Sequence, residues 1–256
     1  DKLCRTHNPA SMVPAQVHIR DIAGLVRGAS VGEGLGNAFL SHISECDGVM
    51  HMVRVFEQED ITHVEGELDP IRDLEIIFSE LVAKDIQVVT VMIDKLTTIV
   101  NRGLDKTKKA DLDILLKVKE VLEGGQQIRC AQWNNKEIEY LNTIQLLTSK
   151  PAMFLINMSE RDYFRQKNKW LPKLKEWIDS KTGEPMIPFS AEFEFALMNM
   201  TPEDAANYLT ENKTRTQITR LITTAYHSIN LIHYFTAGQD EVKCWTIQRG
   251  TKAPQA

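Results

Sequence analysis

One apolar run sets the architecture: Ala152-Met153-Phe154-Leu155-Ile156, followed at once by Asn157-Met158-Ser159-Glu160. It predicts a strand, and the polar residues predict a loop that leads into a helix. Gly48 to Phe56 is also mostly apolar and rich in β-branched residues, which is typical of a strand buried on both faces. Met186-Ile187-Pro188-Phe189 leads in the same way into Ser190-Ala191. This repeated order of strand, loop and helix predicts an α/β fold with a mostly parallel sheet.

Further elements are expected on either side of these strands. The alternating run Val17–Arg20 predicts a short strand that ends in Asp21-Ile22-Ala23-Gly24. Helices are expected from Asp69-Pro70 onward, after Glu160 to about Asp179, and from Thr216 to Leu231. The segment from Tyr234 to Ile247 is typical of the opening of a new β-rich unit.

The middle of the chain has a different periodicity. Ile86, Val89, Ile93, Leu96 and Val100 are spaced 3, 4, 3 and 4 residues apart, and a second apolar stripe follows from Leu112 to Leu122. Two such stripes across a polar turn predict antiparallel helices. We therefore expect a helical, coiled-coil-like insertion at 85–147 between two parts of one sheet domain, 1–84 and 148–231. A further domain would begin at 232–256.

Composition excludes several classes of protein. The chain of 256 residues is 43% hydrophobic and 25% charged with a net charge of −5, which argues against binding driven by bulk positive charge. No apolar run is long enough to cross a membrane, and the first residues do not form a secretory signal. The four cysteines lack CxxC spacing, which favours a reducing, cytoplasmic location over a disulfide framework or zinc site.

Three polar motifs follow the predicted strands. Taken singly, Asp21-x-x-Gly24 is read as a turn, Asn157-x-x-Glu160 as a helix cap, and Ser190-Ala191 carries little information. Ligands in parallel sheets bind beyond the carboxyl ends of the strands, where all three motifs are expected. Their order and spacing favour one shared site.

A longer run carries a family resemblance. It comprises Asp21-Ile22-Ala23-Gly24-Leu25-Val26-Arg27-Gly28-Ala29, Gly32-Glu33-Gly34-Leu35-Gly36-Asn37 and Phe39-Leu40. This run resembles the switch II region of the Obg-like ATPases, the YchF subfamily of the P-loop GTPases. Further likeness is found in Asp60-Ile61-Thr62-His63-Val64, Phe235-Thr236-Ala237-Gly238 and Trp245-Thr246-Ile247. The resemblance implies a P-loop GTPase-like nucleotide-binding domain, split by the helical insertion and followed by a β-grasp TGS domain.

The resemblance also implies how phosphates and metal are held. Asp21 resembles the Walker B aspartate, which holds Mg²⁺ through water and steadies the β- and γ-phosphates. Gly24 would bring its backbone N–H to the γ-phosphate, because glycine has no Cβ in the way. The glycines from Gly28 to Gly36 would let this loop reorder as that phosphate comes and goes. A merely flexible surface loop is the alternative. ATP and Mg²⁺ are the implied cofactors.

Base selection departs from that of ordinary GTPases. Their Asn-Lys-x-Asp motif uses the aspartate to accept hydrogen bonds from the guanine N1–H and N2–H₂ groups. Here Met158 occupies the lysine place and Glu160 the aspartate place, so the carboxylate is one methylene out of register. Asn157 and the Met158 backbone could read the N6/N7 edge of adenine, with Ser190 and Ala191 completing the nucleotide site. The resemblance implies a preference for ATP.

Two readings of His51 are open. Ras-like GTPases use a glutamine after Asp-x-x-Gly to orient the attacking water, and that position here is Leu25, which cannot do so. The resemblance to bacterial members suggests His51 as a catalytic substitute. The alternative is a strand histidine with a structural role.

The sequence contains no G-x-x-x-x-G-K-[ST] motif. In the resembled family that P-loop would lie upstream of Asp1, so this chain alone is expected to be inactive. The complete protein is expected to be a slow Mg²⁺-dependent ATPase switch associated with ribosomes or RNA. The alternative is a non-catalytic module that binds the ribosome or RNA through the helical insertion and the TGS portion.

Overall fold

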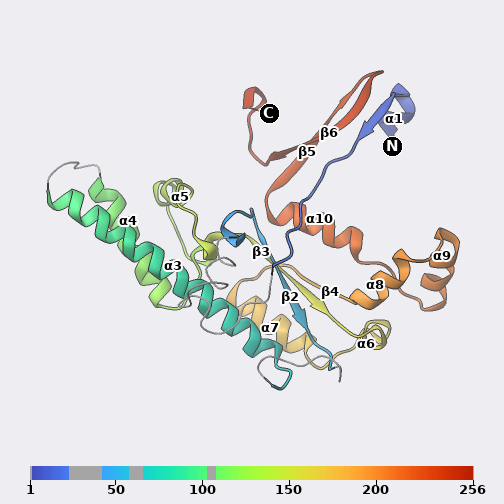
Figure 1. The fold of residues 1–256 in the computed structure, drawn as a ribbon, viewed down its shortest axis with the longest axis horizontal. Helices are drawn as coiled ribbons and strands as arrows, with labels where there is room; N and C mark the ends of the chain where they lie inside the picture. The colour runs from blue at the N-terminus through green and yellow to red at the C-terminus, as the bar shows by residue number, and fades with distance from the viewer. Residues whose placement is uncertain (1, 23–41, 58–65, 103–107, 256) are drawn as a thin grey trace. The chain divides into compact units, whose positions relative to one another are not determined.

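The computed structural model describes residues 2–22, 42–57, 66–102 and 108–255. It contains two compact units (Figure 1). We call Ile22–Thr214 the central unit, and Asp1–Asp21 together with Arg215–Ala256 the terminal unit.

The central unit contains a parallel sheet in the order β2-β3-β4, made by Val49–Arg54, Ala152–Asn157 and Met186–Phe189. The predicted α/β class and parallel pairing are confirmed. Strand β3 is the middle strand, and its residues Ala152 to Ile156 are all buried. Successive side chains point to opposite faces of the sheet, so a continuous apolar run suits a strand that is buried on both faces.

Helices cover one face of this sheet. Phe154, Ile156 and Val53 form a core with Leu74 of α3 (Pro70–Asn101) and with Leu174 and Ile178 of α7 (Leu171–Lys181). Asp69 caps α3 by accepting hydrogen bonds from the Ile71 and Arg72 N–H groups, and Pro70 occupies the first turn.

The predicted helical pair is present. Helix α3 is continuous over 32 residues, so it joins the expected helix at Pro70 to the stripe that ends at Val100. It lies beside α4 (Lys108–Glu123) as a hairpin (Figure 1). Val89, Leu115 and Val118 are fully buried between the two helices. Because α3 also packs on the sheet, the extent 85–147 for an insertion remains a proposal.

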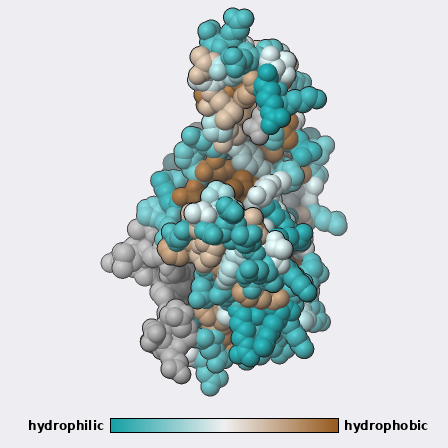
Figure 2. Space-filling model, turned by 90° about the vertical axis from the view of Figure 1, so that its right-hand side faces the viewer, coloured by the Kyte–Doolittle hydropathy of each residue, from teal (hydrophilic) through white to brown (hydrophobic). Residues whose placement is uncertain are grey.

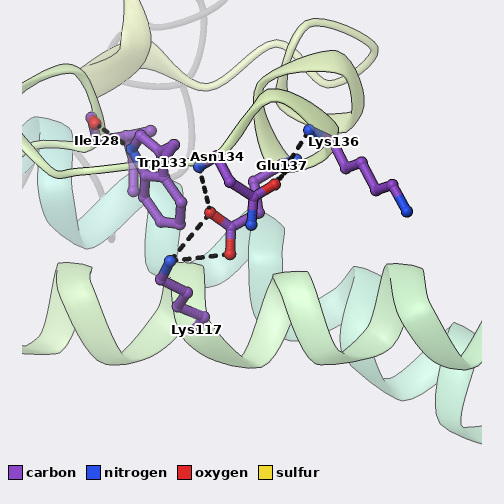
Figure 3. A network of polar contacts seen from close by, with 6 residues as sticks. All are labelled: Lys117, Ile128, Trp133, Asn134, Lys136 and Glu137. Atoms are coloured by element: carbon purple, nitrogen blue, oxygen red, sulfur yellow. Dashed lines mark hydrogen bonds and ion pairs between the residues drawn. The ribbon is translucent and has the colours of Figure 1, made fainter.

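A polar network fixes α5 (Asn135–Leu141) on this hairpin (Figure 3). The Asn134 side chain accepts from the Glu137 N–H, and the Glu137 carboxylate accepts from the Asn134 N–H, which makes a reciprocal cap. Lys117 of α4 donates to both oxygens of that carboxylate, at 2.8 and 3.0 Å. The same ammonium lies 4.8 Å from the Trp133 ring centroid. These contacts order the chain between α4 and η2, the short 3₁₀ helix Leu147–Ser149.

The helix expected after Glu160 is divided. The structure has α6 (Glu160–Arg165) and then α7, because Gln166 adopts a left-handed conformation with φ of +50°. The Asn168 amide donates to the Val55 carbonyl and its oxygen accepts from the Trp170 N–H, which replaces helical hydrogen bonds. After β4 the chain forms α8 (Ala191–Met198) and α9 (Pro202–Glu211).

The terminal unit is built around an antiparallel hairpin of β5 (Leu231–Ala237) and β6 (Glu241–Gln248), with β1 (Ser11–Val13) parallel to β6. The expected β-rich segment is thus confirmed. Its helices are α1 (Lys2–His7) and α10 (Ile218–Ser228), and it also contains the short 3₁₀ turn η3 (Ala253–Gln255). The other short 3₁₀ turn, η1 (Ile128–Cys130), belongs to the central unit. The helix expected to reach Leu231 ends earlier, because Asn230 has φ of +56° and the strand begins next.

The expected strand at Val17–Arg20 is wrong. These residues have no regular secondary structure, and Ile19 is 68% exposed. A strand needs a hydrogen-bonding neighbour, and no strand in the described ranges pairs with this segment.

Candidate functional site

The candidate site lies where β3 and β4 end side by side. The two strands are parallel, and Asn157 is the register partner of Phe189. The Met158 N–H donates to the Phe189 carbonyl at 2.9 Å, so the pairing continues past the end of β3. The Ala191 N–H donates to the Asn157 side-chain oxygen at 3.0 Å. Two motifs 34 residues apart are therefore joined by direct hydrogen bonds, as strand-end placement predicted.

Each strand end leads directly into a capped helix. The Ser159 hydroxyl accepts from the Asp162 N–H at the start of α6, and the Ser190 hydroxyl accepts from the Phe193 N–H at the start of α8. Serine is favoured at this position because its oxygen pairs an N–H that the helix leaves free. The Ser190 side chain is thus used for local structure, and Ser190 is fully buried.

The residues expected to contact the nucleotide base, the base motif Asn157-x-x-Glu160 with Met158, differ in their exposure to solvent. Met158 is 2% exposed and packs in the core with Phe154 and Ile156, so its side chain supports the sheet and faces no solvent. Asn157 and Glu160 are partly exposed, and Ala191 is exposed. The Asn157 oxygen is already engaged with Ala191, which leaves its amide NH₂ group as a hydrogen-bond donor for a ligand.

Glu160 has a partner that sequence reasoning missed. The Tyr208 hydroxyl of α9 donates to its carboxylate at 2.6 Å. This hydrogen bond raises the pKa of Tyr208 to about 12, with burial and the Glu160 charge contributing less. The two residues are 48 positions apart, and no spacing rule connects them.

His51 lies away from this group, in the middle of β2. Its ring contacts the rings of Phe78 of α3 and Phe154 of β3, with centroids 5.5 and 5.1 Å away, and those two rings also contact each other at 6.3 Å. The residue is 7% exposed, and burial together with the charge of Arg129 lowers its pKa to about 3. Of the two readings of His51, this geometry supports the structural one.

The phosphate and metal residues are not joined to the base motif by any described contact. Asp21 is exposed and belongs to the terminal unit, so its role with Mg²⁺ stays a prediction. Gly24, Leu25 and the glycines from Gly28 to Gly36 lie outside the described residues.

Known proteins resemble this chain along its whole length. A GTPase family model described as "50S ribosome-binding GTPase" matches residues 3–92, and the YchF-GTPase_C model, described as a protein of unknown function, matches residues 231–256. The chain is 51% identical to Obg-like ATPase 1 of Caenorhabditis elegans and 52% identical to that of Rattus norvegicus. Both alignments cover 100% of this chain and 65% of the relative, so the chain spans about two thirds of the length of these curated proteins.

A solved structure agrees with these matches. The YchF GTPase of Schizosaccharomyces pombe superposes with a TM-score of 0.88 at 48% sequence identity. The match covers 100% of this chain and 69% of that protein.

Proposed function

The chain belongs to the YchF subfamily of the Obg-like ATPases, and on that premise we propose that the full-length protein is an ATP-binding, slowly ATP-hydrolysing switch. The main support for the proposal is the hydrogen bond that the Ala191 N–H donates to the Asn157 side-chain oxygen, at the ends of two adjacent parallel strands. Strand ends of this kind are where α/β proteins place ligands. The switch would alternate between states according to whether the γ-phosphate is bound.

ATP is the preferred nucleotide in this proposal. Guanine recognition by the related Asn-Lys-x-Asp motif needs a carboxylate that accepts from the ring N1–H and the exocyclic N2–H₂ group, whereas adenine has neither of those donors. Glu160 is longer than the aspartate it replaces, and its carboxylate already accepts from Tyr208. The Asn157 NH₂ group can donate to an acceptor on the adenine edge.

Magnesium would be held through the phosphates. Mg²⁺ in nucleotide sites is usually bound by one or two carboxylates, water and phosphate oxygens. We assign the role of that carboxylate to Asp21, because it resembles the Walker B aspartate and is exposed to solvent. In the ranges that the structure describes, no group of three His, Cys, Asp or Glu residues could hold a metal alone. Because the sequence contains no G-x-x-x-x-G-K-[ST] motif, we propose that these 256 residues by themselves do not hydrolyse ATP efficiently.

The nucleotide preference can be tested with Glu160→Asp in the full-length protein. Aspartate is too short to keep the Tyr208 contact and restores the guanine-reading carboxylate, so the ratio of ATP to GTP affinity should fall about tenfold. Competition binding with both nucleotides measures this ratio. We avoid adding Met158→Lys, because Met158 is buried and a lysine there would bury a charge.

A matched control is Asn157→Ala. It removes an amide that serves either base and releases Ala191, so both affinities should fall together. A wild-type protein that binds GTP more tightly than ATP would contradict the proposal.

An RNA-binding role has separate support in the terminal unit. Tyr234 and Trp245 are register partners on one face of the hairpin, with ring centroids 6.5 Å apart and exposed fractions of 36% and 39%. The Lys243 ammonium lies 3.7 Å from the Trp245 centroid. Basic residues outnumber acidic ones in this unit, although the whole chain is acidic. Aromatic rings beside a cation are the usual platform for single-stranded RNA bases.

Trp245→Ala should therefore weaken binding of the full-length protein to single-stranded RNA by about 1–3 kcal/mol, the range for one lost base stack. Fluorescence anisotropy with a labelled oligouridine measures the affinity. Phe235→Ala is the control, because Phe235 is 53% exposed on the opposite face of the same hairpin. Equal losses in both variants would count against a specific platform.

None of the helices in the described ranges combines the length and apolar character of a membrane span. Figure 2 shows one face of the molecule, where a mostly hydrophilic surface is interrupted by hydrophobic areas. Cytoplasmic location and ribosome association remain proposals.

A further inference from the structure

The carboxylate at the base motif is held from a distant helix. Glu160 is the first residue of α6, and Tyr208 lies in α9, 48 residues later. Their contact of 2.6 Å has the length of a hydrogen bond between a hydroxyl donor and a charged oxygen. Such bonds are about twice as strong as neutral ones, so this contact restricts where the carboxylate can lie.

The Tyr208 ring is positioned independently of its hydroxyl. It stacks on Phe193 of α8 at 6.0 Å and meets Phe164 of α6 edge-on at 6.2 Å. Phe193 is fully buried and also contacts Tyr163. The ring therefore sits in an aromatic cluster, made by Tyr163, Phe164, Phe193 and Tyr208, that joins the helices following β3 and β4. Removing the hydroxyl alone should leave this packing in place.

The hydroxyl is a constant donor near neutral pH. Its hydrogen bond to Glu160 raises the pKa of Tyr208 to about 12, so the proton stays on the tyrosine. A carboxylate oxygen that accepts from Tyr208 is directed toward α9. Guanine would need the same carboxylate to turn toward its N1–H and N2–H₂ groups.

We propose that Tyr208 is a positioning residue that sets base specificity, by holding the Glu160 carboxylate on α9 and away from a guanine base. The inference rests on the proposed function, because it assumes that the nucleotide base binds beside Asn157 and Glu160. It adds a residue outside the Asn157-x-x-Glu160 motif to the groups that discriminate against GTP. The Tyr208 hydroxyl occupies the Glu160 oxygen that guanine would need as an acceptor. Adenine has no donors at positions 1 and 2, so its binding is not weakened by this contact.

The test is Tyr208→Phe in the full-length protein, with ATP and GTP affinities measured by competition. Freed from the hydroxyl, Glu160 can accept from guanine, so GTP affinity should rise and the ATP to GTP ratio should fall about tenfold, the discrimination of one hydrogen bond to a charged group. ATP affinity should stay within about twofold of wild type. The double variant Tyr208→Phe with Glu160→Gln should restore the wild-type ratio, because glutamine has one acceptor oxygen and no charge.

Tyr226→Phe is the matched control. Its hydroxyl donates to the Gln16 carbonyl at 3.1 Å in the terminal unit, so its loss should leave the ratio unchanged. A Tyr208→Phe protein with an unchanged ratio would overturn the inference and leave the proposed function standing. Equal loss of both nucleotides with a lowered melting temperature would also overturn it, because the role would then be structural. A wild-type protein that binds neither nucleotide would instead remove the proposed function itself.

Discussion

Asp85→Ala should lower the free energy of unfolding by about 3 kcal/mol or more, because it leaves two buried N–H groups unpaired at about 1–3 kcal/mol each. Asp85 of α3 is 1% exposed. Its two oxygens accept from the Leu147 and Thr148 N–H groups, each at 2.8 Å, and from the Thr148 hydroxyl at 2.6 Å. Burial raises the pKa of this carboxyl, and the Thr148 and Leu147 hydrogen bonds oppose the rise.

The contact ties the long helix to the segment that enters β3. Leu147 and Thr148 begin the 3₁₀ turn η2, and β3 starts four residues after Thr148. Loss of the carboxylate should therefore loosen the strand that carries Asn157. Urea unfolding followed by circular dichroism measures the change.

Asp94→Ala is the matched control for this prediction, because Asp94 is exposed on the same helix. Its effect should stay within about 0.5 kcal/mol, as for most surface substitutions. Asp85→Asn should fall between the two, since one acceptor oxygen remains. An Asp85→Ala protein as stable as wild type would show that water or rearrangement replaces the three hydrogen bonds.

The stability of the folded protein should fall as the pH drops from about 6.5 toward 3, through His51. The folded-state pKa of His51 is lowered to about 3 from 6.5, so within this window the unfolded chain binds a proton that the folded chain does not. Stability is then fully present above pH 6.5 and decreases on acidification. At about 1.4 kcal/mol per pH unit, the loss from this residue should reach about 2 kcal/mol at pH 5.

His51→Phe separates this effect from other titrations. Phenylalanine keeps an aromatic ring in the cluster with Phe78 and Phe154 but binds no proton, so the difference in stability between pH 7.5 and pH 5 should shrink by about 2 kcal/mol. His227→Gln, at an exposed position, should leave the wild-type difference in place. If the His51→Phe protein showed the same stability difference between pH 7.5 and pH 5 as the wild type, the claim that His51 is buried and neutral would be wrong.

The same variant addresses catalysis. A full-length His51→Phe protein that is folded and hydrolyses ATP at the wild-type rate in a single turnover would support the structural reading. A folded variant that binds ATP but loses turnover would restore His51 to the mechanism, because a group used only in the transition state contributes to rate and not to affinity.

The sequence by itself determined the elements whose burial shows in local periodicity. The apolar run from Ala152 to Ile156 became the central strand, and the stripe from Ile86 to Val100 became one side of a helical hairpin. The helix start at Asp69-Pro70 could also be predicted, because Asp69 accepts from N–H groups only two or three residues away. The meeting of Asn157 and Ala191 followed from a general rule, that parallel strands end at one edge.

Only the tertiary structure decided which long-range partners each residue has. Val17–Arg20 alternates like a strand, yet alternation supplies no hydrogen-bonding neighbour. The sequence leaves His51 open as a catalytic or a structural residue, and only the fold shows its ring packed with those of Phe78 and Phe154. The contacts of Asp85 with Thr148 and of Glu160 with Tyr208 span 63 and 48 residues. Periodicity reports how one element is buried, whereas a hydrogen bond between distant side chains depends on where two elements are packed, and that position is set by the whole core.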